Sequence, residues 1–287
     1  MFTHTVKKLP KNTHQISVTI PQEDVKQHYA AAFAKLQKDL AVEGFRKGKV
    51  PQEIAEKHLA KGDVYQQLLK DLLPDIYSDI IKRENIMPII SPKIDIVKAD
   101  DTNDWELAIT VAEKPTIDLS KYKEIVKKAK GEVKTADIWV PGKDPEEKKP
   151  EAASQEALNT VLSALLKELK IEIPDLLIEQ ELDQKLTKMV DDIQRVGLSV
   201  DSYLKTKNMT MEDLRTQLTR EIDETYKLEF LLAEISEVEN IQVDKADMDK
   251  LFGNIKDENE RKQAEQNAYF YATILRKQKT IDYILSL

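Results

Sequence analysis

The residues of this chain best suited to chemistry lie in one short segment, Gly44-Phe45-Arg46-Lys47-Gly48-Lys49-Val50-Pro51. An arginine can bind a carboxylate or a phosphate through two parallel hydrogen bonds, a lysine supplies a point charge, and a phenylalanine supplies apolar area. Glycine allows positive φ, and proline suits the first turn of a following helix. The pattern therefore predicts a shaped loop that can dock on a surface of phosphate and protein.

Charge and turn chemistry alone favour a simpler interpretation, a solvated basic loop between two helices. Apolar residues recur at intervals of three and four over residues 25–40, which predicts a helix before the segment. A second, shorter helix is predicted over residues 52–59. The segment would then connect two helices, and its docking role depends on more than its own composition.

Patterns typical of enzymes and metal sites are missing from the sequence. The four histidines, His4, His14, His28 and His58, do not have the spacing of a helical zinc motif. The glycines form neither a Walker-type nor a Rossmann pattern, and there is no nucleophile elbow. The absence of cysteine excludes disulfides, thiol nucleophiles and cysteine metal sites. We expect no catalytic residue, no metal site and no cofactor, and so a binding protein.

Composition limits the partners. The 287 residues are enough for two domains, and 33% of them are charged while only 6% are aromatic. The net charge is −8, which argues against a general nucleic-acid binder. Residues 1–115 hold 17 basic and 17 acidic side chains, so the whole excess of acidic residues lies after residue 115. A neutral head with a basic loop could approach an RNA-rich particle.

The first residues lack an apolar signal region and no apolar run reaches membrane-spanning length, so we expect a cytosolic chain.

Local periodicity predicts an α+β domain over residues 1–115. Strand-like alternation covers residues 2–20, and further strands are expected over 93–97 and 105–111. Between them lie the two helices named above and a third over residues 64–83, which Pro74 should kink or interrupt. Strands and helices in this order, without a βαβ rhythm, are typical of an α+β fold.

The second half of the chain has a different character. Residues 127–153 are charged and interrupted by proline and glycine, so we expect an extended linker over 116–153, with Ile138-Trp139-Val140 as a small docking point. From residue 154 onward, apolar stripes predict helices over 154–169, 176–196, 199–204, 210–237, 244–252 and 258–285, with Gly197 ending the second and Thr210 capping the fourth. The expected fold is thus an elongated multi-domain chain with an all-α domain over 154–287.

The segment of residues 44–51 resembles the ribosome-docking signature of the trigger factor family, bacterial chaperones that sit at the exit of the peptide tunnel. The order of elements over 1–115 is similar to the family's N-terminal domain, and residues 173–182 and 234–244 resemble the starts of its two helical arms. Trigger factors commonly insert an FK506-binding-type prolyl-isomerase domain between head and body, which needs on the order of 100 residues. Residues 116–153 are too few, so the resemblance is to a form without that domain.

The resemblance implies an ATP-independent chaperone for protein folding and export, cytoplasmic and associated with the ribosome. Its implied partners are the large ribosomal subunit near the tunnel exit (ribosomal protein and rRNA) and nascent or unfolded polypeptides. A weak homodimer off the ribosome is also implied, without a membrane partner. The residues implied in ribosome binding are Gly44, Phe45, Arg46, Lys47, Gly48 and Pro51.

Client binding requires apolar side chains that repack around many sequences, and flexible thioethers and aliphatic groups suit this. Residues of these types gather near the expected end of one helical arm and in the second arm. For any one of them, a place in the ordinary core of a helix pair is the simpler interpretation. The expected client-binding residues are Met189, Val196, Leu198, Tyr203, Leu204, Met209, Met211, Leu251 and Phe252.

Two other functions stay open. One is an extracytoplasmic holdase resembling the SurA chaperones, which would require export. The other is a trigger factor that retains prolyl-isomerase activity. A purely structural or nucleic-acid-binding role is disfavoured by the acidic body.

Overall fold

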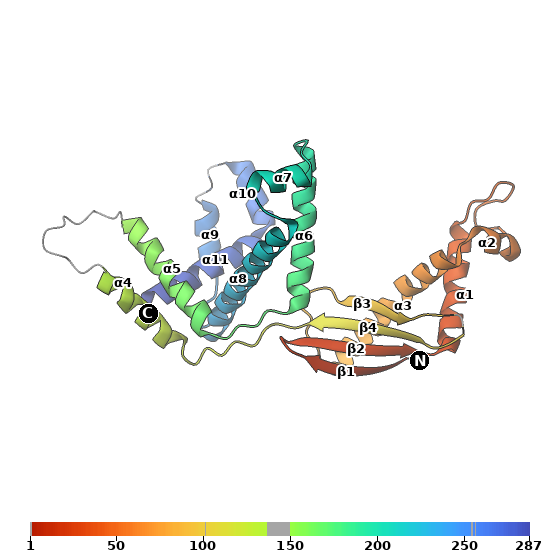
Figure 1. Ribbon diagram of the computed structural model, residues 1–287, viewed down its shortest axis with the longest axis horizontal. Helices are drawn as coiled ribbons and strands as arrows, with labels where there is room; N and C mark the ends of the chain where they lie inside the picture. Colours follow the sequence, from red (N-terminus) through yellow and green to blue (C-terminus); the bar gives the residue numbers. More distant parts are fainter. Residues whose placement is uncertain (1, 101, 137–149, 254, 256) are drawn as a thin grey trace. The chain divides into compact units, whose positions relative to one another are not determined.

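The computed structural model describes residues 2–100, 102–136, 150–253, 255 and 257–287, and of 132–136 and 150–155 it describes the backbone alone. The chain divides into two compact units, Met1–Lys114 and Pro115–Leu287. Figure 1 shows a sheet with helices in unit 1 and helices in unit 2. The predicted fold classes, α+β followed by all-α, are confirmed.

Unit 1 is built on a four-stranded antiparallel sheet with the order β1-β2-β4-β3. The first two strands form a hairpin, and the last two follow three helices. Its elements are β1 (Thr3–Leu9), β2 (Thr13–Ile20), α1 (Gln22–Asp39), α2 (Gln52–His58), α3 (Lys61–Glu84), β3 (Lys93–Lys98) and β4 (Trp105–Ala112).

One face of this sheet forms the core of unit 1. Residues alternate between the two faces of a strand, so the inward side chains of β2 meet those of β4 across the ladder. Ile16 lies opposite Ile109, and Ile20 lies opposite Trp105. All four are essentially buried. The core also includes the apolar stripe of α3, which recurs every four residues: Val64, Leu68, Leu72, Ile76 and Ile80.

The third helix was expected to be kinked or interrupted at Pro74, and it is not interrupted there. α3 runs as one helix through Pro74, so the predicted interruption is absent. Proline removes one hydrogen bond and crowds the preceding turn. Leu72 and Ile76, on either side of it, are buried in the core of unit 1, and this packing holds the helix together across the proline.

Within the described residues, all regular elements of unit 2 are helices, and none of the described helices of the chain is both long and apolar enough to cross a membrane. The contacting pairs include α4 with α5, α6 with α8, α5 with α8 and α8 with α11. The elements are α4 (Tyr122–Ala136), α5 (Pro150–Glu168), α6 (Asp175–Arg195), α7 (Val200–Lys207), α8 (Met211–Val238), α9 (Lys245–Gly253), α10 (Glu258–Gln266) and α11 (Ala268–Ser286).

The extended linker expected over residues 116–153 is wrong for part of that range. α4 occupies 122–136, and α5 begins at Pro150. Tyr122, Ile125, Val126 and Ala129 are buried, and α4 contacts α5. These four side chains recur at helical spacing, but the lysines between them made the segment look solvated. The expected docking point at 138–140 lies outside the described residues.

Two predicted helix boundaries in unit 2 are confirmed, and one predicted helix is wrong. Gly197 has φ +77°, and Leu198 N–H donates to the carbonyl of Ile193 just after α6. Thr210 and Asp213 form a capping box at the start of α8. The single helix expected over 258–285 is two helices, α10 and α11, because the chain leaves helical geometry at Asn267.

Candidate docking loop and client-binding surface

The loop of residues 40–51 connects α1 to α2 and is closed at its base by a side chain. Gln37 Nε2 donates a hydrogen bond of 2.7 Å to the carbonyl oxygen of Val50, and the Val50 side chain is buried in the core of unit 1. Two backbone hydrogen bonds shape the rest of the loop, from Phe45 N–H to Val42 O at 3.0 Å and from Lys49 N–H to Arg46 O at 2.9 Å. The loop is therefore a folded structure that presents its tip in a defined way.

Both glycines of the loop have a backbone that other residues rarely adopt. Gly44 has φ +88° and Gly48 has φ +78°. At Gly48 an added Cβ would also lie 3.4 Å from the carbonyl oxygen of Lys38. Pro51 ends the loop as the residue before α2, with φ −59°. The glycine and proline positions predicted from the sequence are thus the points where the chain turns.

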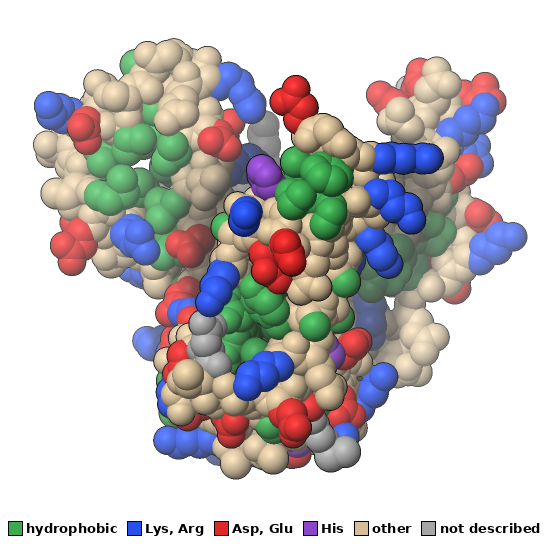
Figure 2. All heavy atoms as spheres, turned by 90° about the vertical axis from the view of Figure 1, so that its right-hand side faces the viewer, with side chains coloured by type: hydrophobic (Ala, Val, Ile, Leu, Met, Phe, Trp, Pro, Cys, Tyr) green, Lys and Arg blue, Asp and Glu red, His purple; other side chains and the backbone are tan. Residues whose placement is uncertain are grey.

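The tip of the loop directs its ring and its guanidinium to the surface. Phe45 is 40% exposed, and Arg46 is exposed and makes no ion pair with the residues that the structure describes. Lys47 Nζ lies 3.1 Å from Asp39 Oδ1, and both side chains are exposed, so this pair is weak. Figure 2 looks onto the end of unit 1 that carries α2, where basic side chains lie beside a hydrophobic patch.

The six residues predicted to dock, Gly44, Phe45, Arg46, Lys47, Gly48 and Pro51, are all exposed and lie in this one loop or at its end. Exposed Lys49 adds a further cation. An exposed guanidinium beside an apolar ring can bind a phosphate or a carboxylate and cover apolar area at the same time.

The expected client-binding residues separate into a set that packs between helices, buried or partly buried, and an exposed set. Met189, Tyr203, Leu204 and Met209 belong to the core between α6, α7 and α8, together with Leu182 and Leu214. Phe252 is buried, with its ring edge-on to Tyr271, and Leu251 is half-buried. Of these six residues only Leu204 and Phe252 are fully buried, and the other four are partly covered by neighbouring helices, so the six offer less apolar area to a client than the exposed residues do. Val196, Leu198 and Met211 are exposed at the end of α6 and the start of α8.

A second exposed apolar surface was missed by the sequence analysis. On α11, Tyr269 is 88% exposed and Phe270 60%, and Ile274 is also exposed one turn later. Tyr269 lines a surface cavity of about 490 Å³ together with Ile241, Val243 and Arg276. The signal available in the sequence was the aromatic run at 269–271. It was assigned to one continuous helix, and in that setting an apolar stripe is expected to be buried.

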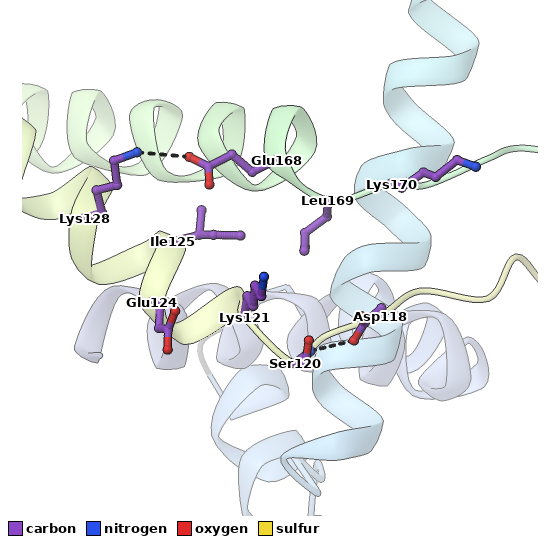
Figure 3. A pocket seen from close by; sticks show the side chains of 9 residues that line it. All are labelled: Asp118, Ser120, Lys121, Glu124, Ile125, Lys128, Glu168, Leu169 and Lys170. Atoms are coloured by element: carbon purple, nitrogen blue, oxygen red, sulfur yellow. Dashed lines mark hydrogen bonds and ion pairs between the residues drawn. The ribbon is translucent and has the colours of Figure 1, made fainter.

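Figure 3 shows a second cavity, of about 500 Å³, between the start of α4 and the end of α5. Two of its charged side chains form an exposed ion pair, in which Lys128 Nζ lies 3.6 Å from Glu168 Oε1. Asp118 accepts the Ser120 N–H at 2.9 Å, and this bond lowers the pKa of Asp118. Within the described part of the chain, no group of three or more histidine, aspartate or glutamate side chains could hold a metal ion.

Glu239, at the end of α8, is the centre of a polar cluster. It accepts hydrogen bonds from the Tyr122 hydroxyl and, at 2.6 Å, from the Tyr283 hydroxyl, and it lies 2.8 Å from Lys123 Nζ. Lys123 and the two tyrosines lower the pKa of Glu239 to about 2, while burial and Glu239 raise the pKa of Tyr122. The cluster ties α4 and α11 to the end of α8.

The fold defined by these two units is that of the trigger factor chaperones. A solved structure reported for promiscuous substrate recognition in the folding and assembly activities of the trigger factor chaperone aligns with 98% of this chain and 99% of its own, at a TM-score of 0.61 and 14% identity. That identity establishes the fold alone.

The sequence establishes the family. The model for bacterial trigger factor protein matches residues 2–139, and the model for its C-terminus matches residues 142–286. This chain therefore belongs to the trigger factor family. The two matches leave only residues 140 and 141 between them, so no isomerase domain lies between the N-terminal and C-terminal parts.

Individual relatives match over about half of this chain. The trigger factor of Ligilactobacillus salivarius is 37% identical over 133 residues, which are 46% of this chain and 30% of that protein. The trigger factor of Listeria welshimeri is 34% identical over 151 residues, 52% of this chain and 35% of that protein. The alignments thus span about a third of these relatives' length. Because these matches are to trigger factors, they give no support to a holdase of the SurA type.

Proposed function

We propose that this protein is an ATP-independent chaperone that docks at the exit of the ribosomal tunnel and shields apolar segments of nascent chains. In this proposal, residues 1–115 bind the large ribosomal subunit, and residues 154–287 bind nascent or unfolded polypeptides. Membership of the trigger factor family supports both roles. The protein acts in the cytoplasm, and off the ribosome it associates weakly into a homodimer.

The observation that carries the proposal is the state of the loop tip. A loop that docks must offer its binding groups to the partner and must not use them internally. Phe45 is exposed, Arg46 is free of ion pairs with the described residues, and the Gln37–Val50 hydrogen bond holds the loop at its base. Preorganisation of this kind reduces the entropy lost on binding.

Ribosome co-sedimentation of the full chain tests the docking role. Replacing Phe45, Arg46 and Lys47 by alanine removes the ring and two cations, and we expect binding to ribosomes to fall at least about tenfold. The matched control is the pair Lys7→Ala and Lys8→Ala, which removes two exposed cations from β1 of the same unit. Ribosome binding that survives the triple change, or that falls equally in the control, contradicts the proposal.

Client binding is assigned to the exposed apolar side chains of the helical unit. Tyr269 and Phe270 on α11 are the most exposed aromatic pair there. Replacing both by serine should raise the concentration needed to suppress aggregation of a denatured model protein by at least about twofold, because apolar area is lost without loss of fold. The control replaces two exposed polar residues of the neighbouring α10, Asn259→Ser and Gln266→Ser. If the Tyr269 and Phe270 variant suppressed aggregation as well as the control variant, this surface would be excluded as a client-binding site.

The proposal contains no prolyl-isomerase activity. The family matches cover the N-terminal and C-terminal parts without an isomerase domain between them, which supports a chaperone without catalysis. Isomerisation of a proline-containing tetrapeptide should proceed at the uncatalysed rate in the presence of the protein. Saturable catalysis would overturn this part of the proposal. Analytical ultracentrifugation of the free protein tests the weak homodimer.

A further inference from the structure

The sheet of unit 1 has two outer strands, β1 and β3, and neither pairs on its outer side with any strand that the structure describes (Figure 1). An outer strand directs every second backbone N–H and carbonyl away from the sheet, where another strand can pair with them. The two edges differ in charge. β1 carries exposed Lys7 and Lys8 and no acidic residue, so two copies of β1 would repel each other. β3 carries charges of both signs, on Lys93, Asp95 and Lys98.

An irregularity in β3 places two opposite charges on one face of the sheet. The pairing of β3 with β4 shifts by one residue between Ile96 and Lys98. Asp95 lies opposite Ala108 and Lys98 lies opposite Glu106, and because these β4 positions are two apart, they share a face. In a regular strand, residues 95 and 98 would point to opposite faces. The bulge therefore brings an exposed carboxylate and an exposed ammonium to the same face of the edge strand, and neither makes an ion pair with the described residues.

Apolar side chains are also exposed at this edge. Ile96 lies opposite Leu107, which is buried in the core of unit 1, yet Ile96 itself is 51% exposed. Val97, the residue that the register shift skips, is 64% exposed. The sheet thus ends at β3 with apolar area that a further strand beside β3 would remove from water.

A second copy of β3 has the charges that this edge requires. If two antiparallel copies are related by a twofold axis between Ile96 and Val97, Asp95 of each copy lies opposite the partner's Lys98, so two pairs of opposite charge form. The same register places Ile96 opposite the partner's Val97. An apolar client segment would leave these charged side chains unpaired. Pairing of β3 with β1 of another copy would leave a free edge at each end and continue into a chain of copies, whereas the β3–β3 pair is closed.

We propose that two copies of this chain associate through the outer edge of β3, so that their two four-stranded sheets join into one antiparallel sheet. This inference rests on the proposed function, because it gives the site and the chemistry of the weak homodimer proposed above. Six residues of each strand take part, over roughly 20 Å. A contact of this length is small for a stable dimer, which agrees with weak association.

Exchange of the two charges tests the edge, with sedimentation equilibrium of the full chain as the measurement of the dimer Kd. Asp95→Lys sets cations opposite each other, and Lys98→Asp sets anions opposite each other, so each should raise the Kd at least about tenfold. The double variant restores opposite charges, and its Kd should return to within about threefold of wild type. An equimolar mixture of the two single variants should form a heterodimer of similar affinity, because each then supplies the charge that the other lacks.

The matched control is Lys7→Asp on β1, which makes the same charge change as Lys98→Asp at the other edge of the sheet and should alter the Kd by less than about twofold. Equal weakening by this control overturns the inference, since it would be an effect of net charge. Single variants that dimerise like wild type, or a double variant that stays weak, overturn it and leave the homodimer with another interface. A wild-type chain that remains monomeric at all concentrations overturns the homodimer itself, and with it this inference. Ribosome co-sedimentation reports on the docking role separately.

Discussion

The side-chain amide of Gln37 in α1 lies 2.7 Å from the carbonyl oxygen of Val50, thirteen residues further along the chain. The side chain of Val50 is buried in the core of unit 1. The end of the loop is therefore held twice, by the hydrogen bond to α1 and by the packing of Val50. The exposed tip at Phe45 and Arg46 is thereby carried on a fixed base. The geometry of the loop depends on a residue that lies outside the eight-residue signature.

Replacing Gln37 by alanine should loosen the loop while unit 1 stays folded. Loss of one hydrogen bond is expected to lower the free energy of unfolding by about 1 kcal/mol and ribosome affinity by about three- to tenfold. Hydrogen exchange of the Lys49 amide, which is bonded to Arg46 O, should accelerate. Gln27→Ala, at an exposed position of the same helix, is the control and should leave exchange in the loop unchanged.

Both loop glycines should lose stability on replacement by alanine. Both have positive φ, so Gly44→Ala and Gly48→Ala should each destabilise by about 1 kcal/mol. The Cβ added at Gly48 would lie 3.4 Å from Lys38 O, which is van der Waals contact without overlap. Gly62→Ala, within α3 and with open space around the new Cβ, should be neutral or stabilising by up to about 1 kcal/mol. Thermal or urea unfolding measures all three, and an equal effect at positions 48 and 62 would contradict the argument.

Stability should depend on pH through Glu239. Its carboxylate has a pKa of about 2 in the folded protein, below its ordinary value of 4.5. The stabilisation is therefore fully present above about pH 4.5 and is lost as the pH falls towards 2. Glu239→Gln should lower the free energy of unfolding by about 1–3 kcal/mol at pH 7. The difference from wild type should shrink on acidification through that window, whereas the exposed control Asp249→Asn should show neither effect.

Two leucines of the same arm should separate stability from client binding. Leu204 is buried between α6, α7 and α8, so Leu204→Ala should destabilise by about 2–4 kcal/mol. Leu198 is exposed after α6, so Leu198→Ser should change stability by less than about 0.5 kcal/mol. Only the second variant should lose aggregation suppression at a temperature where both stay folded. A stable Leu204→Ala protein would show that the arm core is not as packed as described.

Most of the fold could be predicted from periodicity, because the buried faces repeat at the spacing of their elements. The stripe of α3 and the alternation of β4 are such cases. The preferences of single residues also predicted that Gly197 ends α6 and that Thr210 and Asp213 cap the start of α8. α4 was missed because Lys127, Lys128 and Lys130 flank its few apolar residues. The charged composition of the segment led to its assignment as a linker, although the apolar residues have helical spacing.

The loop and the client surface differ in how much the sequence could reveal. Loop geometry is local, since glycine, proline and nearby hydrogen bonds shape it, and the residues predicted to dock are all at the surface. Exposure of apolar side chains in a helical body depends on which helix covers which face. Periodicity therefore could not distinguish buried Leu204 from exposed Leu198, or foresee that Tyr269 would be open.

The place of β4 in the sheet has a consequence for synthesis. β4 is the last strand of unit 1 to be made, yet it lies between β2 and β3 and pairs with both. The N-terminal hairpin must therefore wait for about ninety more residues before its inner edge is covered, and long-range pairing of this kind is slow. Until residues 105–112 have emerged from the translating ribosome, a new copy of this protein therefore has an open sheet edge at β2, which can pair with strands of other chains.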